Sequence, residues 1–348
     1  MTDLATQPAA ADAAAPGGLD PRLEEHRREL TAYSYRMLGS AFEAEDAVQE
    51  TMIRAWRGLS GFDGRASLRS WMYRIATNVC LDMLKGRNRR ALPMDLTAAG
   101  EPVAEALGEP LDATAWVEPM ADSRVLPSSA DPAETAVARE SIRLAFVAAL
   151  QYLPPRQRAV LILREVLAWS AAETAELLDT SVASVNSALQ RARATMGSRD
   201  TTDDRPDPMN EANRALLERY VAAFEAFDME ALVGLIAEDA VQVMPPFALW
   251  MRGRDDIIMW MADGRPGAGC RGSRLLPFEA NGQPAFAAYR PSGPDGLHQP
   301  FSIQVLHVED DRIVGFSHFL DTNLFPLFGL PRHPDGPVGP AGAGAPTG

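Results

Sequence analysis

The chain has 348 residues, a net charge of −14, and 46% apolar and 23% charged residues, a balance typical of a protein with two or three globular domains. It contains no run of 18 apolar residues, so no membrane-spanning helix is expected. Its two cysteines, Cys80 and Cys270, are too few for a disulfide framework. The composition therefore predicts a cytoplasmic protein that does not contact membranes.

The acidic charge is unevenly distributed along the chain. The net charge is +3 for residues 20–91 and +3 for residues 137–199. It is −8 for residues 92–136 and −10 for residues 200–348. Two basic modules are thus separated by an acidic segment, and the acidic total does not exclude a nucleic-acid partner.

Composition divides the chain into six parts. Helix formers dominate two of them, and a third is rich in proline and acids and is predicted to be an extended linker. A fourth mixes amphipathic helices with alternating strands, and both ends are rich in Ala, Pro or Gly. The predicted parts are a disordered tail 1–19, helical modules 20–91 and 137–199, a linker 92–136, a mixed domain 209–330 and a flexible tail 331–348.

The segment 43–57 predicts an amphipathic helix. Small and apolar residues recur at helical spacing and predict one buried face: Ala44, Ala47, Val48, Thr51, Met52, Ala55 and Trp56. The opposite face is polar and carries Asp46, Gln49 and Glu50. Taken alone, this face is typical of a helix surface in contact with solvent.

A turn at 61–64 precedes a second helix, in which aromatic residues alternate with arginines. This mixture suits single-stranded DNA, because bases stack on rings while guanidinium groups bind phosphates. The candidates for such contacts are Phe62, Arg65, Arg69, Tyr73, Arg74 and Asn78. Trp71 is equally well explained as a core residue. The basic cluster that ends the helix, Lys85, Arg87, Arg89 and Arg90, is more typical of a solvated helix end than of a DNA contact.

Residues 154–196 predict a helix-turn-helix. Pro154 and Pro155 favour a helix start, Ser170 with Glu173 forms a capping box, and Ser181 is a suitable cap for the last helix. That helix is predicted to pack through Val182, Val185, Leu189 and Met196. Its polar side suits the major groove of DNA, and the candidate contacts are Ser184, Asn186, Ser187, Gln190, Arg191 and Arg193.

The region after residue 208 predicts an α+β domain, since helices come first and a strand meander follows. The helices are expected at 210–227, 229–236 and 255–261, and the strands at 241–244, 275–279, 285–289, 301–308 and 313–320. Asn281-Gly282 and Asp310-Asp311 are the expected hairpin turns.

Several aromatic and polar residues of this last domain are candidates for a small-ligand pocket: Met244, Phe247, Trp250, Trp260, His307, His318 and Asp321. His318 and Asp321 are three residues apart and have the chemistry for proton transfer. However, a histidine between phenylalanines on a strand is more often structural. We expect no metal, no cofactor and no catalytic residue, because metal-ligand spacings, nucleophile motifs and phosphate loops are missing. A regulatory or sensory domain is favoured over an enzyme.

The first module resembles domain 2 of the extracytoplasmic-function (ECF) sigma factors, on the residues AED-x-VQE-x-x-x-RAWR and F-x-G-x-x-S-L-R-S-W-M-Y-R-I-A-x-N. The resemblance implies that Asp46, Gln49 and Glu50 bind the clamp of the largest subunit of core RNA polymerase. It also implies that the following loop and helix, with the six DNA candidates named above, read the −10 promoter element and open the duplex.

The second module resembles ECF sigma domain 4, on LPPRQR-x-VL-x-L-R-E and the helix that contains SVASVNSALQRAR. This implies binding to the −35 promoter element and to the flap of the second-largest polymerase subunit. The family commonly has a basic residue where Asn186 and Ala188 stand, which predicts modest affinity for phosphates here.

The last domain resembles the SnoaL-like branch of the NTF2-like cone fold, by element order and position. Its fusion behind sigma domain 4 resembles the SigG-like subgroup of ECF factors, as does the W-x-E-P stretch that begins at Trp116. We expect Trp116 to dock on a folded domain, preferably the C-terminal one. Two other hypotheses are a SnoaL-like enzyme or sensor with a DNA-localising N-terminal half, and a helix-turn-helix repressor that acts without polymerase. The residues that resemble domain 2 argue strongly against the repressor.

Overall fold

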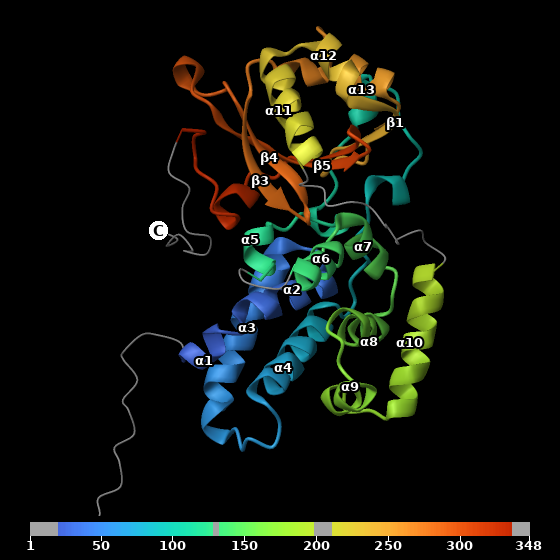
Figure 1. Ribbon diagram of the computed structural model, residues 1–348, viewed down its shortest axis with the longest axis vertical. Helices are drawn as coiled ribbons and strands as arrows, with labels where there is room; N and C mark the ends of the chain where they lie inside the picture. Colours follow the sequence, from blue (N-terminus) through green and yellow to red (C-terminus); the bar gives the residue numbers. More distant parts are fainter. Residues whose placement is uncertain (1–19, 128–131, 198–210, 336–348) are drawn as a thin grey trace, which may run out of the picture.

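The computed structural model describes residues 20–127, 132–197 and 211–335. The predicted tail 1–19 and residues 336–348 of the predicted C-terminal tail lie outside the described residues. The described chain forms a helical lobe and a second lobe built on a sheet, with α5, α6 and α7 between them (Figure 1). None of the described helices is long and apolar enough to cross a membrane.

The first helical module contains four helices whose ends coincide with capping residues. Ser40 and Ser67 each accept a hydrogen bond from the main chain three residues later, at 3.2 and 3.1 Å, and so begin the third and fourth helices. Gly39, with φ +71°, ends the second helix. The helices are α1 (Pro21–Glu24), α2 (Arg27–Leu38), α3 (Ala41–Gly58) and α4 (Leu68–Met83).

The second helical module contains the predicted helix-turn-helix. Its capping box is present as predicted, because Ser170 accepts from the Glu173 main chain at 3.2 Å while Glu173 accepts from Ser170 at 2.8 Å. One packing prediction is wrong, since Val182 at the start of the last helix is 43% exposed. The helices are α6 (Pro132–Glu140), α7 (Leu144–Leu150), α8 (Pro155–Leu161), a π-helical turn (Ile162–Val166), α9 (Ala171–Leu177) and α10 (Val182–Gly197).

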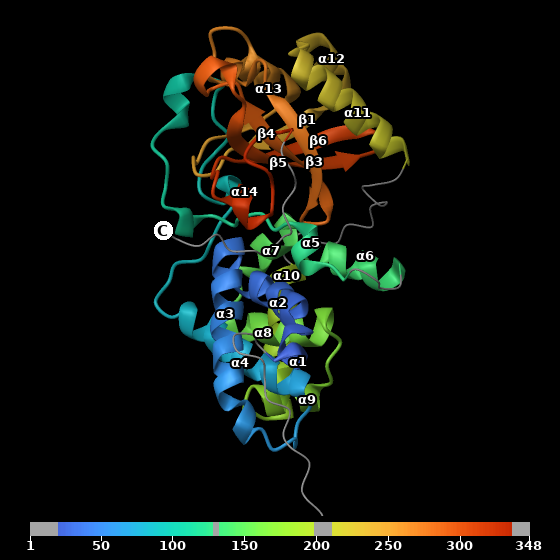
Figure 2. The same cartoon turned by 90° about the vertical axis from the view of Figure 1, so that its left-hand side faces the viewer.

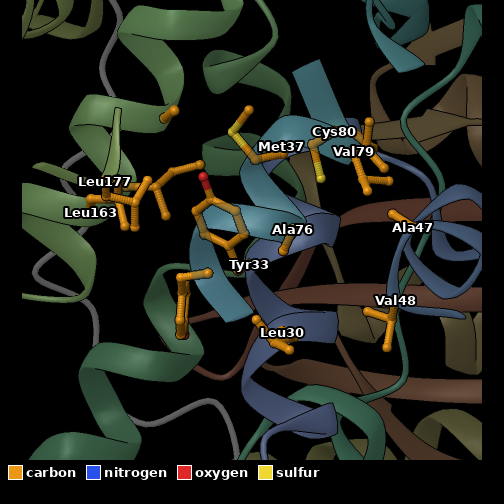
Figure 3. Packing of buried hydrophobic residues seen from close by; sticks show 14 of the residues in the cluster. Leu30, Tyr33, Met37, Ala47, Val48, Ala76, Val79, Cys80, Leu163 and Leu177 are labelled. Carbon is orange, nitrogen blue, oxygen red and sulfur yellow. The ribbon is translucent and has the colours of Figure 1, made fainter. Parts of the chain in front are cut away.

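The two helical modules share one apolar core. Tyr33 and Met37 of α2 pack in the same cluster as Leu163 and Leu177 of the second module (Figure 3). The rings of Tyr33, Tyr73 and Trp169 follow one another, with centroids 5.2 Å apart in each step. The modules are therefore packed face to face in this arrangement rather than separated by a free linker.

The linker is more ordered than the sequence predicts. It contains short helical turns at Pro93–Asp95, Ala104–Leu107 and Ala113–Ala115, and the short helix α5 (Asp122–Val125). Residues 92–115, the linker loop, leave the first module, run along the C-terminal domain and return (Figure 2). The Ala91 amide donates to Ala115 at 2.8 Å, and the Val117 amide donates to Ala91 at 3.1 Å, so the two ends of the loop meet.

The C-terminal domain places three helices, α11 to α13, on one face of a curved six-stranded sheet and the short helix α14 on the other. The strand order is β2-β1-β6-β5-β4-β3, with β1 and β6 parallel and all other neighbours antiparallel. Its elements are α11 (Glu211–Ala226), α12 (Met229–Leu235), β1 (Ile236–Val243), β2 (Trp250–Arg252), α13 (Arg254–Met261), β3 (Arg274–Ala280), β4 (Gln283–Arg290), β5 (Gln299–Glu309), β6 (Arg312–Phe319) and α14 (Leu324–Leu327).

The two faces of the sheet belong to different cores. Phe286 and Leu306 pack with α11, α12 and α13 inside the domain. Ala287 and Val305, on the other face, pack with α14, the linker and α7. This alternation along single strands positions the β3–β4 hairpin against the helical lobe. Both predicted turns are present, with positive φ at Asn281, Gly282, Asp310 and Asp311.

Candidate protein and nucleic-acid interfaces

The outer face of α3 carries the residues predicted to bind polymerase. Asp46 and Gln49 are exposed and Glu50 is partly exposed. Ile53 and Trp56 lie on the same face and are 42% and 60% exposed. The prediction that Trp56 belongs to the buried face is therefore wrong, because the ring turns outward at the edge of the apolar stripe. Burial, followed by the charges of Glu43 and Glu45, raises the pKa of Asp46.

The loop before α4 holds one part of the predicted −10 surface. The rings of Phe62 and Trp71 lie 5.1 Å apart, and both are half-buried. Arg65 is exposed and pairs with Asp63 at 2.5 Å. Asn78 is exposed further along the helix. These residues are accessible to a nucleic acid in the arrangement described.

Arg69, Tyr73 and Arg74 instead contact other parts of the helical lobe. Tyr73 is fully buried, donates to Glu29 at 3.1 Å and packs on Trp169. Arg69 pairs with the same Glu29 at 2.8 Å and lies over the Tyr73 and Trp169 rings. Arg74 donates to the main chain of Glu176 in α9 at 3.3 Å. The sequence predicted that DNA bases stack on Tyr73. In this arrangement such stacking is excluded, because the second module covers the ring.

The recognition helix α10 presents its polar residues to solvent. Ser184 is held by the cap residue Ser181 at 3.2 Å, as predicted. Arg191 donates to Ser187 at 2.7 Å, and Arg193 pairs with Glu165 at 2.6 Å. All six −35 candidates are exposed: Ser184, Asn186, Ser187, Gln190, Arg191 and Arg193.

Two buried arginines join the helical modules, and the sequence analysis did not identify them. Arg36 of α2 donates to the main chain and hydroxyl of Ser141 at 3.1 and 2.6 Å. Arg158 of α8 donates to the main-chain oxygen of Met37 and to Gln151. Burial lowers the pKa of each guanidinium to about 10. A local pattern gives no signal for the contacts that join the modules, because Ser141 and Met37 lie more than 100 residues from their arginines.

The β3–β4 hairpin of the C-terminal domain is enclosed where the modules meet. Asn281 exchanges two 2.9 Å hydrogen bonds with the main chain of Met120. The side-chain nitrogen of Asn281 donates to the Tyr35 hydroxyl and to the main-chain oxygen of Ile142, both at 2.6 Å. The Gly282 amide donates to Asp122 at 2.9 Å. Burial raises the pKa of this carboxyl to about 7.

Trp116 is 2% exposed, as its predicted docking requires. Its main chain pairs with Ala91, at the end of the first module, rather than with the C-terminal domain. Arg90 donates to the Trp116 oxygen at 2.6 Å. The following residues Met120 and Ala121 pack with the C-terminal domain, so the W-x-E-P stretch connects both.

The predicted ligand-pocket residues are divided between the interior and the linker loop. Met244 and Trp260 are buried between the sheet and the helices, whereas Phe247 is half-buried. Trp250 donates its indole N–H to the main chain of Thr97 at 2.9 Å and so binds the linker loop.

His318 and Asp321 do not form a pair in the part of the chain that the structure describes. The His318 ring stacks on Phe316, with centroids 5.8 Å apart. Burial and then the charge of Arg290 lower its pKa to about 4, so the imidazole is neutral. Asp321 accepts hydrogen bonds from Asn323. His307 lies 3.4 Å from Ser317. The described residues contain no group of three or more His, Cys, Asp or Glu arranged to hold a metal.

Three family models match the chain: Sigma-70 region 2 at residues 23–90, Sigma-70 region 4 at residues 143–196, and the SnoaL-like domain at residues 217–316. Together with the fold, these matches define a sigma factor that carries an α+β NTF2-like domain. The chain belongs to the ECF RNA polymerase sigma factors. As such it binds core polymerase and promoter DNA and directs the initiation of transcription.

The relatives include ECF sigma factors that align with this chain over most of its length. The ECF sigma factor SigG of Mycobacterium tuberculosis is 47% identical over 319 residues, which cover 90% of this chain and 84% of the relative. SigJ of the same species is 29% identical over 282 residues, 78% of this chain and 82% of the relative. The SigJ crystal structure superposes with a TM-score of 0.56 at 23% identity, covering 90% of this chain and 99% of that one.

Proposed function

We propose that this sigma factor is held in a closed form by its own C-terminal domain, and that binding to polymerase and promoter requires this form to open. The observation that carries the proposal is the burial of Tyr73, with Arg69 engaged beside it, under the second helical module. A −10 surface that is covered by the −35 module cannot contact DNA along its whole length.

We assign the outer face of α3 to the clamp of the largest polymerase subunit. A large exposed indole next to Ile53, with Asp46, Gln49 and Glu50 around it, has the composition of an interface anchor with a polar rim. This face stays accessible in the closed form, so polymerase can bind it before the helical modules separate.

We assign the exposed face of α10 to the −35 element, and the same module to the flap of the second-largest subunit. Gln190 and Asn186 offer amide groups that suit base edges, and Arg191 offers a cation for phosphate. Asn186 and Ala188 bring no charge where the family commonly has a basic residue, so polymerase must supply part of the binding free energy.

The C-terminal domain acts in this proposal as a restraint and not as an enzyme. Its β3–β4 hairpin is bonded to both helical modules through Asn281. The neutral, stacked His318 is not paired with Asp321, which does not favour proton transfer by these two residues. In this proposal, a small ligand bound near Met244, Trp260 and His318 would change how firmly the C-terminal domain is docked on the helical modules.

Run-off transcription with core polymerase tests the proposal directly. The full chain is compared with a chain that ends at Met196 and with the full-length variant Asn281→Ala, which keeps every domain. We expect both to give several-fold more transcript than the full chain at limiting sigma concentration. Equal or lower yields from both, with circular dichroism showing folded helices, would refute the restraint.

A further inference from the structure

A cleft of about 660 Å³ lies where the first module, the linker loop and the second module meet. Arg87, Arg89 and Arg90 line it from the end of the first module, and Arg158 lines it from α8. Leu96 and Leu111 of the linker loop add apolar surface. Its size is in the range of small-molecule sites.

The four arginines are only partly neutralised. Arg87 and Arg90 both pair with Glu43, the latter at 2.9 Å, and Arg90 also pairs with Glu118 at 3.8 Å. Besides Glu43, the acid that lines the cleft is Asp112. Arg89 lies over the Tyr152 ring at 3.7 Å and has no carboxylate partner in the described ranges of the chain. The cleft therefore carries an excess of positive charge.

Arg158 is the most unusual of the four. It is 3% exposed, and its guanidinium donates only to neutral oxygens of Met37, Gln151 and Leu153. Its Nε has no hydrogen-bond partner among the residues that the structure describes. A buried cation without a counter-charge is costly, and a nearby anion would offset that cost. Burial lowers its pKa to about 10, so the group stays charged at neutral pH.

We propose that this cleft binds a small phosphorylated anion, such as a nucleotide with two adjacent phosphates. Guanidinium groups bind phosphate oxygens in pairs, and a cluster of them suits a doubly charged group. The apolar side of the cleft accommodates the rest of such a molecule. Because three segments of the chain enclose the site, a compact ligand fits it better than the backbone of a duplex.

The position of the cleft gives the ligand a regulatory effect. It is lined by both helical modules and by the linker loop, so the complete site exists only in the closed form. A ligand that binds only one of two states stabilises that state in proportion to its affinity and concentration. The phosphorylated anion would therefore keep the −10 surface covered and lower transcription.

Isothermal titration of the full chain with pyrophosphate and with adenosine diphosphate, at constant ionic strength, tests this proposal. The variants are Arg87→Gln and Arg89→Gln, both at exposed positions, where the substitution should leave the fold intact. The matched control is Lys85→Gln, which removes one charge from the same helix end outside the cleft. Arg158 is left unchanged because it also joins the modules.

We expect saturable binding to the wild type, at least tenfold weaker binding to each arginine variant, and unchanged binding to Lys85→Gln. An equal loss in Lys85→Gln would show a general charge effect and overturn the proposal, as would failure of both probes to bind. A third arm uses a short DNA duplex without polymerase. Binding of the duplex with the same arginine dependence, while neither phosphate probe binds, would assign the surface to nucleic acid and also overturn it.

Discussion

The side-chain amide of Asn281 donates to the hydroxyl of Tyr35, with a nitrogen–oxygen distance of 2.6 Å. Tyr35 in turn donates to the main-chain oxygen of Glu118 at 2.8 Å. One residue of the C-terminal hairpin thus reaches the first helical module, and through Tyr35 the W-x-E-P stretch. Its second bond, to Ile142, reaches the other helical module.

Replacing Asn281 by Ala should loosen the C-terminal domain from the helical lobe. The change removes the side-chain bonds to Met120, Tyr35 and Ile142, all in a buried setting. The Met120 amide and the Ile142 oxygen lose this partner, whereas Tyr35 keeps its bond to Glu118. We expect a loss of about 2–3 kcal/mol of docking free energy. Hydrogen exchange checks this, since protection of the Met120 and Gly282 amides should fall by roughly 30- to 150-fold. The exposed Asn323→Ala should leave that protection unchanged; equal effects would contradict the assignment.

Gly282→Ala should separate docking from turn strain. Gly282 has φ +66°, and an added Cβ would lie 2.8 Å from the main-chain oxygen of Arg139. Gly264 has φ +78° with nothing within 4 Å of its added Cβ, so Gly264→Ala carries the conformational cost alone. We expect Gly282→Ala to lower the thermal midpoint clearly more than Gly264→Ala. Equal shifts of the thermal midpoint would show that the β3–β4 hairpin is not held tightly against Arg139.

Asp122 should make the stability of the docked form depend on pH. Burial raises the pKa of its carboxyl from 3.8 to about 7. Between these values the folded protein keeps a proton that the unfolded chain releases. The free energy of unfolding therefore falls as pH rises through the window, by at most about 1.4 kcal/mol per unit. The facing charges are Glu279, which raises this pKa, and Arg139, which lowers it.

Asp122→Asn keeps the acceptor for the Gly282 amide and removes the titration. The difference in unfolding free energy between wild type and variant should change between about pH 4 and pH 7 and level off at either end. Other titrating groups, such as His318 with its lowered pKa, are common to both proteins and cancel in the difference. A difference in unfolding free energy between the two proteins that stays constant across that pH window would show that Asp122 does not titrate there.

Trp56→Ala should weaken binding to core polymerase by at least tenfold, because large exposed aromatic residues dominate interface energetics. The pair Asp46→Ala and Gln49→Ala should weaken the same binding while the fold survives. Pull-down and fluorescence titration with core polymerase measure the effect. Met259→Ala removes an equally apolar side chain that is 45% exposed on α13 and serves as the control. Unchanged affinity of the α3 variants for core polymerase would exclude the outer face of α3 as the polymerase-binding surface.

The features that local chemistry determines were predictable from the sequence. The Ser170–Glu173 capping box and the Asn281-Gly282 turn are set by a few adjacent residues, and both are present. Five of the six strands were predicted, four of them within about two residues at each end, since their alternation is local; β1 begins five residues before its predicted start. The three-residue strand β2 was missed because it is too short to show a period.

The features that depend on distant contacts were not predictable. The parallel pairing of β1 with β6 joins segments about 75 residues apart and leaves no local trace. The proline-rich composition predicted an extended linker, but it says nothing about docking, so the contact between Trp250 and Thr97 was not predicted. Trp56 and Tyr73 were misjudged for the same reason. The spacing of apolar residues cannot distinguish an aromatic ring that packs in the core from one that is exposed and available to another protein or to DNA.

The meeting of Ala91 with Ala115 and Val117 limits how far the two DNA-reading modules can separate. While these main-chain bonds hold, only the roughly fourteen residues between Val117 and α6 of the second module can extend. That length spans about 50 Å when fully stretched. If the bonds break, the linker loop adds its own length and the span more than doubles. The two hydrogen bonds that close the linker loop thus limit the distance between the promoter elements that the protein can contact at the same time.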